Sequence, residues 1–399
     1  MLAQHLKNIS QNIQENYKNE KNIGVLSGIS GCALFQFYYS KWTDVDNHAD
    51  LGVAIIATCI DRINSGFSYP TYCDGIAGFG WVIQHLTMKN FIDVDCDELL
   101  CPFDNYLFSQ MKIDLSTGKY DFLHGALGYG FLFLKRYQFT TDENLKKRYA
   151  YFLGALLTEL DELAHESGDT VKWEMVMDQE KQQPVCNLGL SHGMASIVNF
   201  LSRLLPLGLY PEKVMRLLTK STRYIVQQRA DQRNTLSKFP NVIQNGKKPN
   251  YNSRLAWCYG DLGIGISLFR AGSELKDGAI QANALDVLIY NSGRRSKKST
   301  MVVDPGLCHG SYGNAQIFGF LNKEHSNDSF QEAADFWVRD GVSKSTFTDG
   351  YAGYKRWDGA TESYRPSLCL LDGVAGIGLS MIDSLTVQKN SWDECLLIS

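Results

Sequence analysis

The fold is decided by a heptapeptide whose most informative copy reads Trp257-Cys258-Tyr259-Gly260-Asp261-Leu262-Gly263. A second copy reads Leu307-Cys308-His309-Gly310-Ser311-Tyr312-Gly313. Both contain a Cys, a polar ring-bearing residue, a Gly, two further residues and a second Gly, and the second copy has His309 directly after its Cys. Two thiolates and one imidazole from the same register of successive repeats make a three-ligand zinc set. The fourth position stays open, as in catalytic rather than structural zinc sites.

The pattern is an internal repeat that runs through the whole chain. Its first glycine falls at positions 28, 75, 125, 193, 260, 310 and 373. An apolar stretch of helical length follows each copy, at 31–39, 79–88, 129–137, 197–205, 264–271, 314–321 and 377–385. Amphipathic segments with helical periodicity lie at 2–17, 51–63, 97–113, 145–165, 211–230, 279–290 and 330–342, one before each copy.

These segments predict an all-α fold. Helices that are apolar on most sides must be buried, and glycines spaced by three let neighbouring backbones approach closely. Seven such helices, each paired with an amphipathic one, predict an α/α toroid, a double ring of seven inner and seven outer helices. We expect one domain over residues 1–399 with a small loop insertion around 166–188. The long loops 166–187, 234–253 and 345–367 should border one face.

Composition limits the function classes. The 399 residues are 44% hydrophobic and carry a net charge of −4, so no basic surplus points to nucleic acid. Residues 1–22 lack an apolar signal core, and the longest apolar runs are too short to span a bilayer. The ten cysteines should then be reduced and mostly inert. We expect a cytoplasmic protein.

The residue before the first glycine varies informatively among the copies. In chain order these residues are Ser27, Asp74, His124, His192, Tyr259, His309 and Asp372. Ser and Asp suit helix N-caps, whereas the third to sixth copies carry a titratable ring. In a ring of repeats these four would line one arc of one mouth, which favours a site. His192 is expected there, and His124 fits either a site or a structural role.

Three further residues are less certain from spacing alone. Cys73 shares the register of the two motif cysteines, but it belongs to the second repeat and is expected to be inert. Asp121 suits a turn as well as a site, and Arg254 suits a solvated surface as well as a site.

These residues resemble the lanthionine synthetase C-like (LanC-like) cyclase family over essentially the whole chain. The most specific pieces are Arg254-Leu255-Ala256-Trp257-Cys258-Tyr259-Gly260 and Leu307-Cys308-His309-Gly310. The resemblance implies an α/α toroid that holds Zn²⁺ by Cys258, Cys308 and His309. It also implies that Asp121, His192, Arg254 and Tyr259 are catalytic. Ser196, where the other copies have Gly, departs from the pattern without touching a ligand.

The resemblance implies a lanthionine synthetase, or lanthipeptide cyclase. Such an enzyme adds peptide Cys thiols to dehydroalanine or dehydrobutyrine and forms thioether rings. Zinc would deprotonate the thiol, and Arg254 or Tyr259 would stabilise the enolate. His192, oriented by Asp121, would transfer the proton, although His192 and Tyr259 could exchange roles.

The implied partners are a dehydrated precursor peptide, a separate dehydratase and an exporter. We expect no dehydratase region in this chain and no membrane span. The protein could still be peripheral to a membrane-associated biosynthetic complex.

Three alternatives remain at this point. The same fold and zinc could add glutathione to dehydroamino acids in proteins. A carbohydrate-active toroid could use Asp74 and Asp372 as paired carboxylates, and a non-catalytic toroid could simply bind peptides. The loop 345–367, with Tyr354 and Trp357, is either an ordinary packed loop or the wall of a peptide groove.

Overall fold

The computed structural model describes residues 1–176, 183–230 and 235–399. In these residues a mostly buried helix follows each glycine motif, as predicted: α2 (Ile29–Thr43), α4 (Ile76–Met88), α6 (Ala126–Phe139), α8 (Met194–Leu204), α10 (Asp261–Glu274), α13 (Ser311–Glu324) and α15 (Val374–Leu385). The predicted amphipathic helices are α1 (Leu2–Asn16), α3 (Asp46–Asn64), α5 (Cys96–Ser116), α7 (Glu143–Glu162), α9 (Pro211–Gln227), α11 (Gly278–Ser292) and α14 (Asp328–Ser343). A short helix, α12 (Lys297–Thr300), lies between α11 and α13.

The chain divides into two units. Unit 1 comprises Met1–Phe103 and Val302–Ser399, and unit 2 comprises Asp104–Met301. Helix α5 contributes residues to both.

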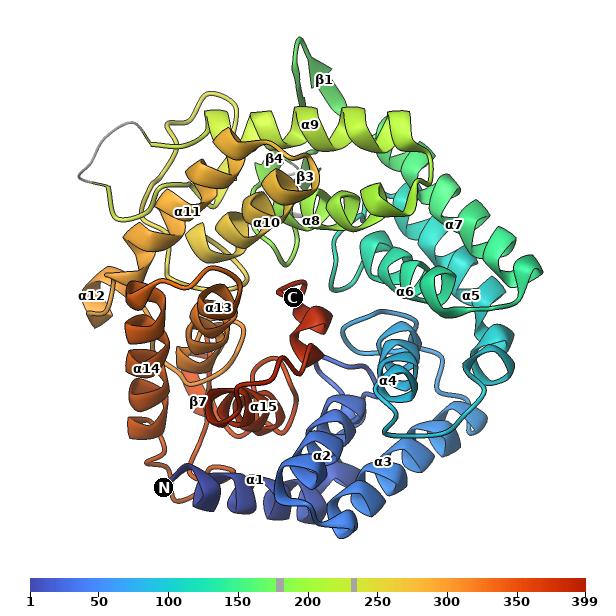
Figure 1. The fold of residues 1–399 in the computed structure, drawn as a ribbon, viewed down its shortest axis with the longest axis vertical. Helices are drawn as coiled ribbons and strands as arrows, with labels where there is room; N and C mark the ends of the chain where they lie inside the picture. The colour runs from blue at the N-terminus through green and yellow to red at the C-terminus, as the bar shows by residue number, and fades with distance from the viewer. Residues whose placement is uncertain (177–182, 231–234) are drawn as a thin grey trace. The chain divides into compact units, whose positions relative to one another are not determined.

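In unit 1, the motif helices pack side by side. Helix α2 lies against α4 and α15, and α15 lies against α13 (Figure 1). The amphipathic helices cover them, with α3 on α2, α14 on α13 and α1 on α15. Helix α2 is buried on every side from Ile29 to Ser40, whereas α3 buries only one stripe. This difference follows from the apolar composition of α2 and the amphipathic pattern of α3.

Unit 2 repeats the same packing. Helix α8 lies between α6 and α10, and α7, α9 and α11 cover α6, α8 and α10 respectively. Helix α9 buries Val214, Leu217, Leu218 and Ser221, the spacing of a single helical face. Apart from α15, which α1 covers, these motif helices are covered by the amphipathic helix that follows them in the chain. The sequence pattern instead pairs each amphipathic segment with the motif after it.

A sharp turn favours the second glycine in five of the motifs. A Cβ at Gly313 or Gly376, for example, would collide with the carbonyl oxygen six residues earlier, that of Leu307 or Leu370. The expected close approach between neighbouring repeats is also present, because a Cβ at Gly31, Gly78, Gly263 or Gly376 would meet a residue of the neighbouring motif. Ser196 is accommodated, and its hydroxyl donates to the Gly193 carbonyl at 2.7 Å.

The N-cap interpretation of Ser27, Asp74 and Asp372 is wrong. The N-caps of α2, α4 and α15 are the glycines that follow these residues, and none of the three caps has a side-chain hydrogen bond. Ser27 Oγ instead lies 3.3 Å from Cys73 Sγ, and Asp372 Oδ2 lies 3.5 Å from Arg356 Nη1. The polar residue therefore sits one position before the helix, where its side chain can turn outward.

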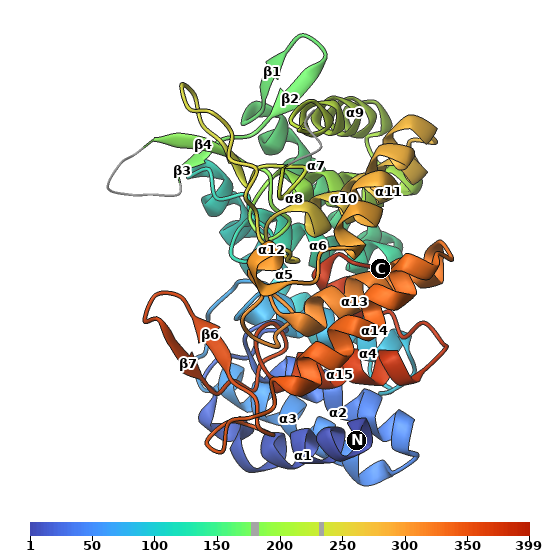
Figure 2. The same ribbon diagram turned by 90° about the vertical axis from the view of Figure 1, so that its left-hand side faces the viewer.

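The long loops carry short antiparallel strands. Unit 2 contains β1 (His165–Ser167), β2 (Thr170–Lys172), β3 (Met175–Val176), β4 (Pro184–Asn187) and β5 (Val242–Ile243), paired as β1–β2 and β3–β4–β5. Strand β2, at the start of the insertion, packs along α9 (Figure 2). Residues 177–182 of the predicted insertion, and Asn234 of the second loop, lie outside the described residues.

Unit 1 contains one hairpin, formed by β6 (Arg356–Asp358) and β7 (Ser363–Arg365). It stands away from the helices of that unit (Figure 2). Among the described residues, none of the helices is both long and apolar enough to cross a membrane.

Candidate functional site

Backbone hydrogen bonds fix the register between motifs. In unit 1, the amides of Leu307 and Cys308 donate to the Leu371 carbonyl at 2.9 and 3.0 Å, and the Leu371 amide donates to Leu26 at 2.8 Å. In unit 2, the amides of Leu190 and Ser191 donate to the Cys258 carbonyl at 3.0 and 3.3 Å. Within each unit, equivalent residues of successive motifs therefore lie side by side, as the register argument requires.

Unit 2 pairs two of the predicted catalytic residues. His192 Nδ1 lies 3.0 Å from Asp121 Oδ1, although the residues are far apart in the chain. The same carboxylate oxygen accepts the amides of Leu123 and His124 at 3.0 and 2.9 Å. Burial would raise the pKa of Asp121, but His192 and the amide donors outweigh it and the pKa is lowered. Asp121 therefore remains a carboxylate and holds one nitrogen of His192.

The motif that carries Cys258 lies beside this pair. The Cys258 carbonyl accepts the Leu190 and Ser191 amides of the turn that presents His192. The Tyr259 ring centroid is 6.3 Å from that of His192. A Cβ on Gly189 would press against the Cys258 carbonyl and the Tyr259 ring, so this glycine permits the close contact. Unit 2 thus brings His192, Tyr259 and Cys258 together.

Two other sequence candidates lie at the edge of this group. Arg254 is half-buried, and its carbonyl faces Gly260, whose φ of +88° requires a glycine. Within the described part of the chain, no hydrogen bond or ion pair of the Arg254 side chain was found. His124 is exposed, and its ring stacks on that of His192 with centroids 6.0 Å apart. His124 is therefore a neighbour of the acid–base pair.

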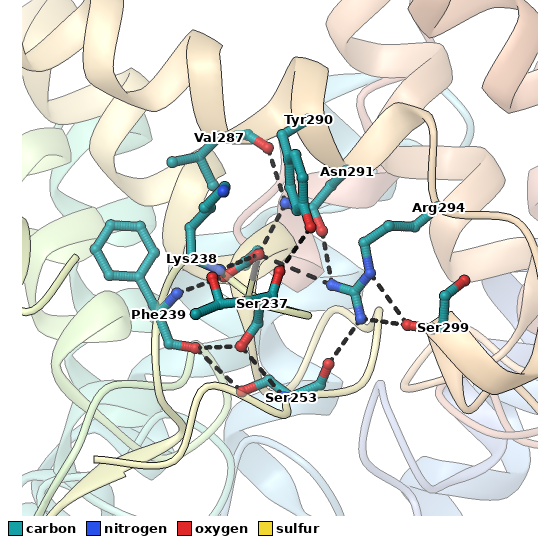
Figure 3. Close-up of polar contacts among 11 residues, drawn as sticks. Ser237, Lys238, Phe239, Ser253, Val287, Tyr290, Asn291, Arg294 and Ser299 are labelled. Atoms are coloured by element: carbon teal, nitrogen blue, oxygen red, sulfur yellow. Dashed lines mark hydrogen bonds and ion pairs between the residues drawn. The ribbon is translucent and has the colours of Figure 1, made fainter. Parts of the chain in front are cut away.

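A buried polar network supports the motif that contains Cys258. The Asp261 carboxylate is inaccessible to solvent and accepts the amides of Lys238 and Phe239, each at 2.8 Å. Arg294 Nη1 lies 3.8 Å from this carboxylate, and Arg294 Nη2 donates to the Ser253 carbonyl at 2.8 Å (Figure 3). Burial raises the pKa of Asp261 despite these donors. The network fastens the loop before Arg254 to the start of α10.

Unit 1 holds Cys308 and His309, both part-exposed at the start of α13. Sequence reasoning missed the residue that contacts this histidine, because Asp304 Oδ2 lies 3.2 Å from His309 Nε2. Burial would raise the pKa of Asp304, but His309 and two backbone amides lower it overall. The segment Asp304-Pro305-Gly306 has the composition of an Asx turn. That composition was the available signal, although it indicates a turn rather than a contact with His309.

The predicted ligand set thus draws Cys258 from unit 2 and Cys308 and His309 from unit 1. The remaining cysteines differ chemically. Burial raises the pKa of Cys59 and Cys186 to about 12 and that of Cys369 to about 11. It also raises the pKa of Cys73 well above the ordinary thiol value. The inert role of Cys73 stays a prediction, because Cys73 belongs, with Asp74 and His124, to a second set of residues that could hold a metal ion.

The loop 345–367 divides into core and surface residues. Tyr354 is 1% exposed, and its hydroxyl lies 3.3 Å from that of Tyr312, so the expectation that it faces a peptide is wrong. Trp357 is half-buried and makes an edge contact with Tyr364, with centroids 5.0 Å apart. Tyr364 also packs on Phe347 at 5.1 Å. The aromatic surface of the hairpin therefore consists of Trp357 and Tyr364.

Comparisons with known proteins bear on the family and the fold. The model of a family described as "Lanthionine synthetase C-like protein" matches residues 19–397. Among curated proteins, none matches the chain. The solved structure of a nisin cyclase is similar, with a TM-score of 0.78 and 15% sequence identity over 99% of this chain and 97% of that chain. This likeness is one of fold, and it confirms the fold class that the seven repeats predict.

Proposed function

Since the chain belongs to the lanthionine synthetase C-like family, we propose that it adds the cysteine thiols of a dehydrated peptide to dehydroalanine or dehydrobutyrine and closes thioether rings. The observation that carries this proposal beyond family membership is the Asp121–His192 pair beside the turn of Cys258. A positioned imidazole is what the final proton transfer of such an addition needs.

The donor set fits a zinc ion. Cys258, Cys308 and His309 each offer one ligand atom of the kind that zinc prefers, and three protein ligands leave a position for substrate. Bound there, zinc would supply one kind of chemistry, the deprotonation of the substrate thiol near neutral pH. Cys308 and His309 are part-exposed, unlike the buried cysteines with raised pKa values, which suits ligands that an incoming thiol must reach.

The chain's own residues would stabilise the charge that develops during the addition and would transfer the proton. Attack of the sulfur at the β-carbon forms the C–S bond and moves the alkene electrons onto the amide oxygen as an enolate. Arg254 or Tyr259 would stabilise that oxygen. The α-carbon then takes a proton and restores the amide, so the thiol proton is balanced by the new C–H bond.

His192 is suited to deliver this proton. Asp121 holds the Nδ1 side of the ring, so Nε2 is the nitrogen that would face the α-carbon. Asp121 acts through His192 and is a positioning residue, because its contact is with the ring and not with the reacting atoms. Kinetic measurements must decide whether His192 or Tyr259 transfers the proton.

A synthetic peptide with one dehydroalanine and one cysteine tests the function. Ring closure leaves the peptide mass unchanged, so the remaining free thiol is alkylated and counted by mass spectrometry. The zinc-loaded protein should remove the thiol faster than buffer with zinc, and His192→Ala should slow it by about 10²–10⁴-fold. A wild-type rate equal to the buffer rate would refute the proposal. Glutathione in a parallel reaction distinguishes the alternative, because acceleration of its addition without ring closure would favour a glutathione-adding enzyme.

A further inference from the structure

The side chain of Asp304 gathers three donors in unit 1. It is 2% exposed, and its Oδ1 accepts the Gly306 amide at 3.0 Å. Its Oδ2 accepts the Trp357 amide at 2.9 Å and lies 3.2 Å from His309 Nε2. Gly306 shares its turn, His309 belongs to the following motif, and Trp357 lies in strand β6 of the distant hairpin.

This arrangement determines which nitrogen of His309 carries a proton. A buried carboxylate without a proton only accepts hydrogen bonds, so the neighbouring Nε2 must be the N–H donor. A neutral imidazole has one N–H and one lone pair, and the hydrogen bond made by one nitrogen sets the role of the other. Nδ1 is then the nitrogen with the lone pair, which is the form a metal ligand needs.

We propose that Asp304 is the positioning residue of His309: it holds Nε2–H, presents Nδ1 to the metal, and fastens the β6–β7 hairpin to the same ligand through the Trp357 amide. The proposal rests on the zinc site of the proposed function. Carboxylates that orient metal-ligating histidines commonly tune metal affinity. Here the same oxygen also fixes the position of the aromatic hairpin relative to His309. One side chain therefore contacts both the proposed metal ligand and the adjoining hairpin.

The first measurement needs no zinc and no variant of Asp304. Nitrogen-15 NMR of the zinc-free full chain, with labelled histidines at about pH 9 where an ordinary imidazole is neutral, reports the tautomer of His309. His309→Gln assigns its signals. The wild type should show the Nε2–H form. A predominant Nδ1–H form would overturn the proposal even if the protein binds zinc well.

The second measurement is zinc affinity by chelator competition. Asp304→Asn should weaken zinc about 10–100-fold, because its amide group can donate to Nε2 and so favour the wrong tautomer. The matched control is Glu324→Gln, which removes a carboxylate of the same unit that pairs with Lys389 at the far end of α13. It should stay within about threefold of wild type, since a distant charge is largely screened.

An Asp304→Asn affinity equal to wild type, or an equal loss in Glu324→Gln, would overturn the proposal. If wild type itself fails to bind zinc, the proposed metal site is wrong, whereas the tautomer of zinc-free His309 still decides whether Asp304 orients the ring. The two failures are therefore distinguishable. If Asp304→Asn folds poorly, the wild-type tautomer decides alone.

Discussion

The Asp121–His192 pair of unit 2 and the Asp304–His309 pair of unit 1 are built from the same parts. Each joins a buried carboxylate of lowered pKa to a part-exposed histidine directly before a motif glycine, at 3.0 and 3.2 Å. The difference lies in which ring nitrogen of the histidine the carboxylate contacts. Asp121 holds Nδ1, and Asp304 holds Nε2. Under the proposed function, the choice of histidine nitrogen, rather than the pairing itself, separates the proposed proton donor from the proposed metal ligand.

The source of each carboxylate also differs. Asp121 comes from the motif before that of His192, so this pair links two repeats. Asp304 comes from the turn just before His309 and also holds the hairpin. A change at Asp121 should therefore disturb proton transfer and the turn whose amides it accepts, whereas a change at Asp304 should disturb both the ligand and the neighbouring loop.

Removal of either histidine should have the largest effect on zinc content or activity, and it tests whether the two pairs have different roles. His309→Ala, like Cys258→Ala or Cys308→Ala, should lose the zinc, of which wild type should carry about one per chain, because two protein ligands hold it poorly. His192→Ala should keep its zinc and lose activity. Metal analysis after gel filtration measures this, with Cys369→Ala as the control that keeps both. Loss of zinc from His192→Ala would show that the two pairs do not have separate roles.

Asp121→Asn should lower kcat by about 10²–10⁴-fold with zinc content unchanged. An amide in this place carries no charge, so it no longer stabilises the imidazolium form of His192 that would donate the proton from Nε2. The assay is the thiol-alkylation time course on the synthetic peptide. A variant that lost zinc and activity in parallel would place Asp121 with the metal ligands instead.

A third buried aspartate sharpens the comparison because its partners include no histidine. Asp261→Ala should lower the free energy of unfolding by about 3–5 kcal/mol, the cost of breaking a buried ion pair from one side. The exposed pair Arg229–Asp286 is the matched control, and Asp286→Ala should cost at most about 1 kcal/mol. Urea unfolding measures both variants. Equal costs would mean that the Asp261 network does not hold the Cys258 motif.

The pH dependence of stability separates the histidine-paired aspartates from Asp393. Burial, and then the neighbouring Asp383 charge, raise the pKa of Asp393 to about 6. The native state then binds more protons than the unfolded state between the ordinary carboxyl pKa and about 6, so this group makes stability fall as pH rises through that window. Asp121 has a lowered pKa, and its contribution is lost instead as pH falls through its native pKa.

Asp393→Asn should therefore flatten the stability curve on the acid side of neutrality, whereas Asp121→Asn should flatten it at lower pH. Thermal unfolding across a pH series tests this. An unchanged slope between about pH 4 and 6 in Asp393→Asn would contradict the assignment.

The hairpin should give the smallest effect. Trp357→Ala keeps the backbone amide whose hydrogen bond Asp304 accepts but removes the half-buried ring. It should slow cyclisation of a long precursor by about tenfold or less, the effect of a contact of roughly 1 kcal/mol, and leave zinc and the short peptide unaffected. An equal loss on both peptides would show that the ring only supports the metal ligand.

Much of this could be predicted from the sequence, and the limits have physical causes. The glycine motifs and the apolar runs after them located the seven buried helices, because both signals are local. Asp121 and Arg254 entered only through the family resemblance, since a lone charged residue looks the same on a surface or in a site. Asp304 was missed because its partner Trp357 is brought close only by the fold.

The errors have the same cause. Tyr354 was placed on the surface because composition does not tell which side of a loop an aromatic ring faces. The N-caps were misassigned because the sharp turn moves the helix start onto the glycine.

The division of the chain has a consequence for biosynthesis. Unit 2 is one continuous segment, whereas unit 1 combines residues 1–103 with residues 302–399. On the ribosome, helices α1 to α4 emerge long before α15, against which α1 and α2 pack. The apolar faces of α1 and α2 that pack on α15 therefore remain uncovered while unit 2 is translated and can fold. During that interval the nascent chain is most exposed to aggregation and to chaperones. The interval ends with the synthesis of residues 302–399, the segment that also contains Cys308 and His309.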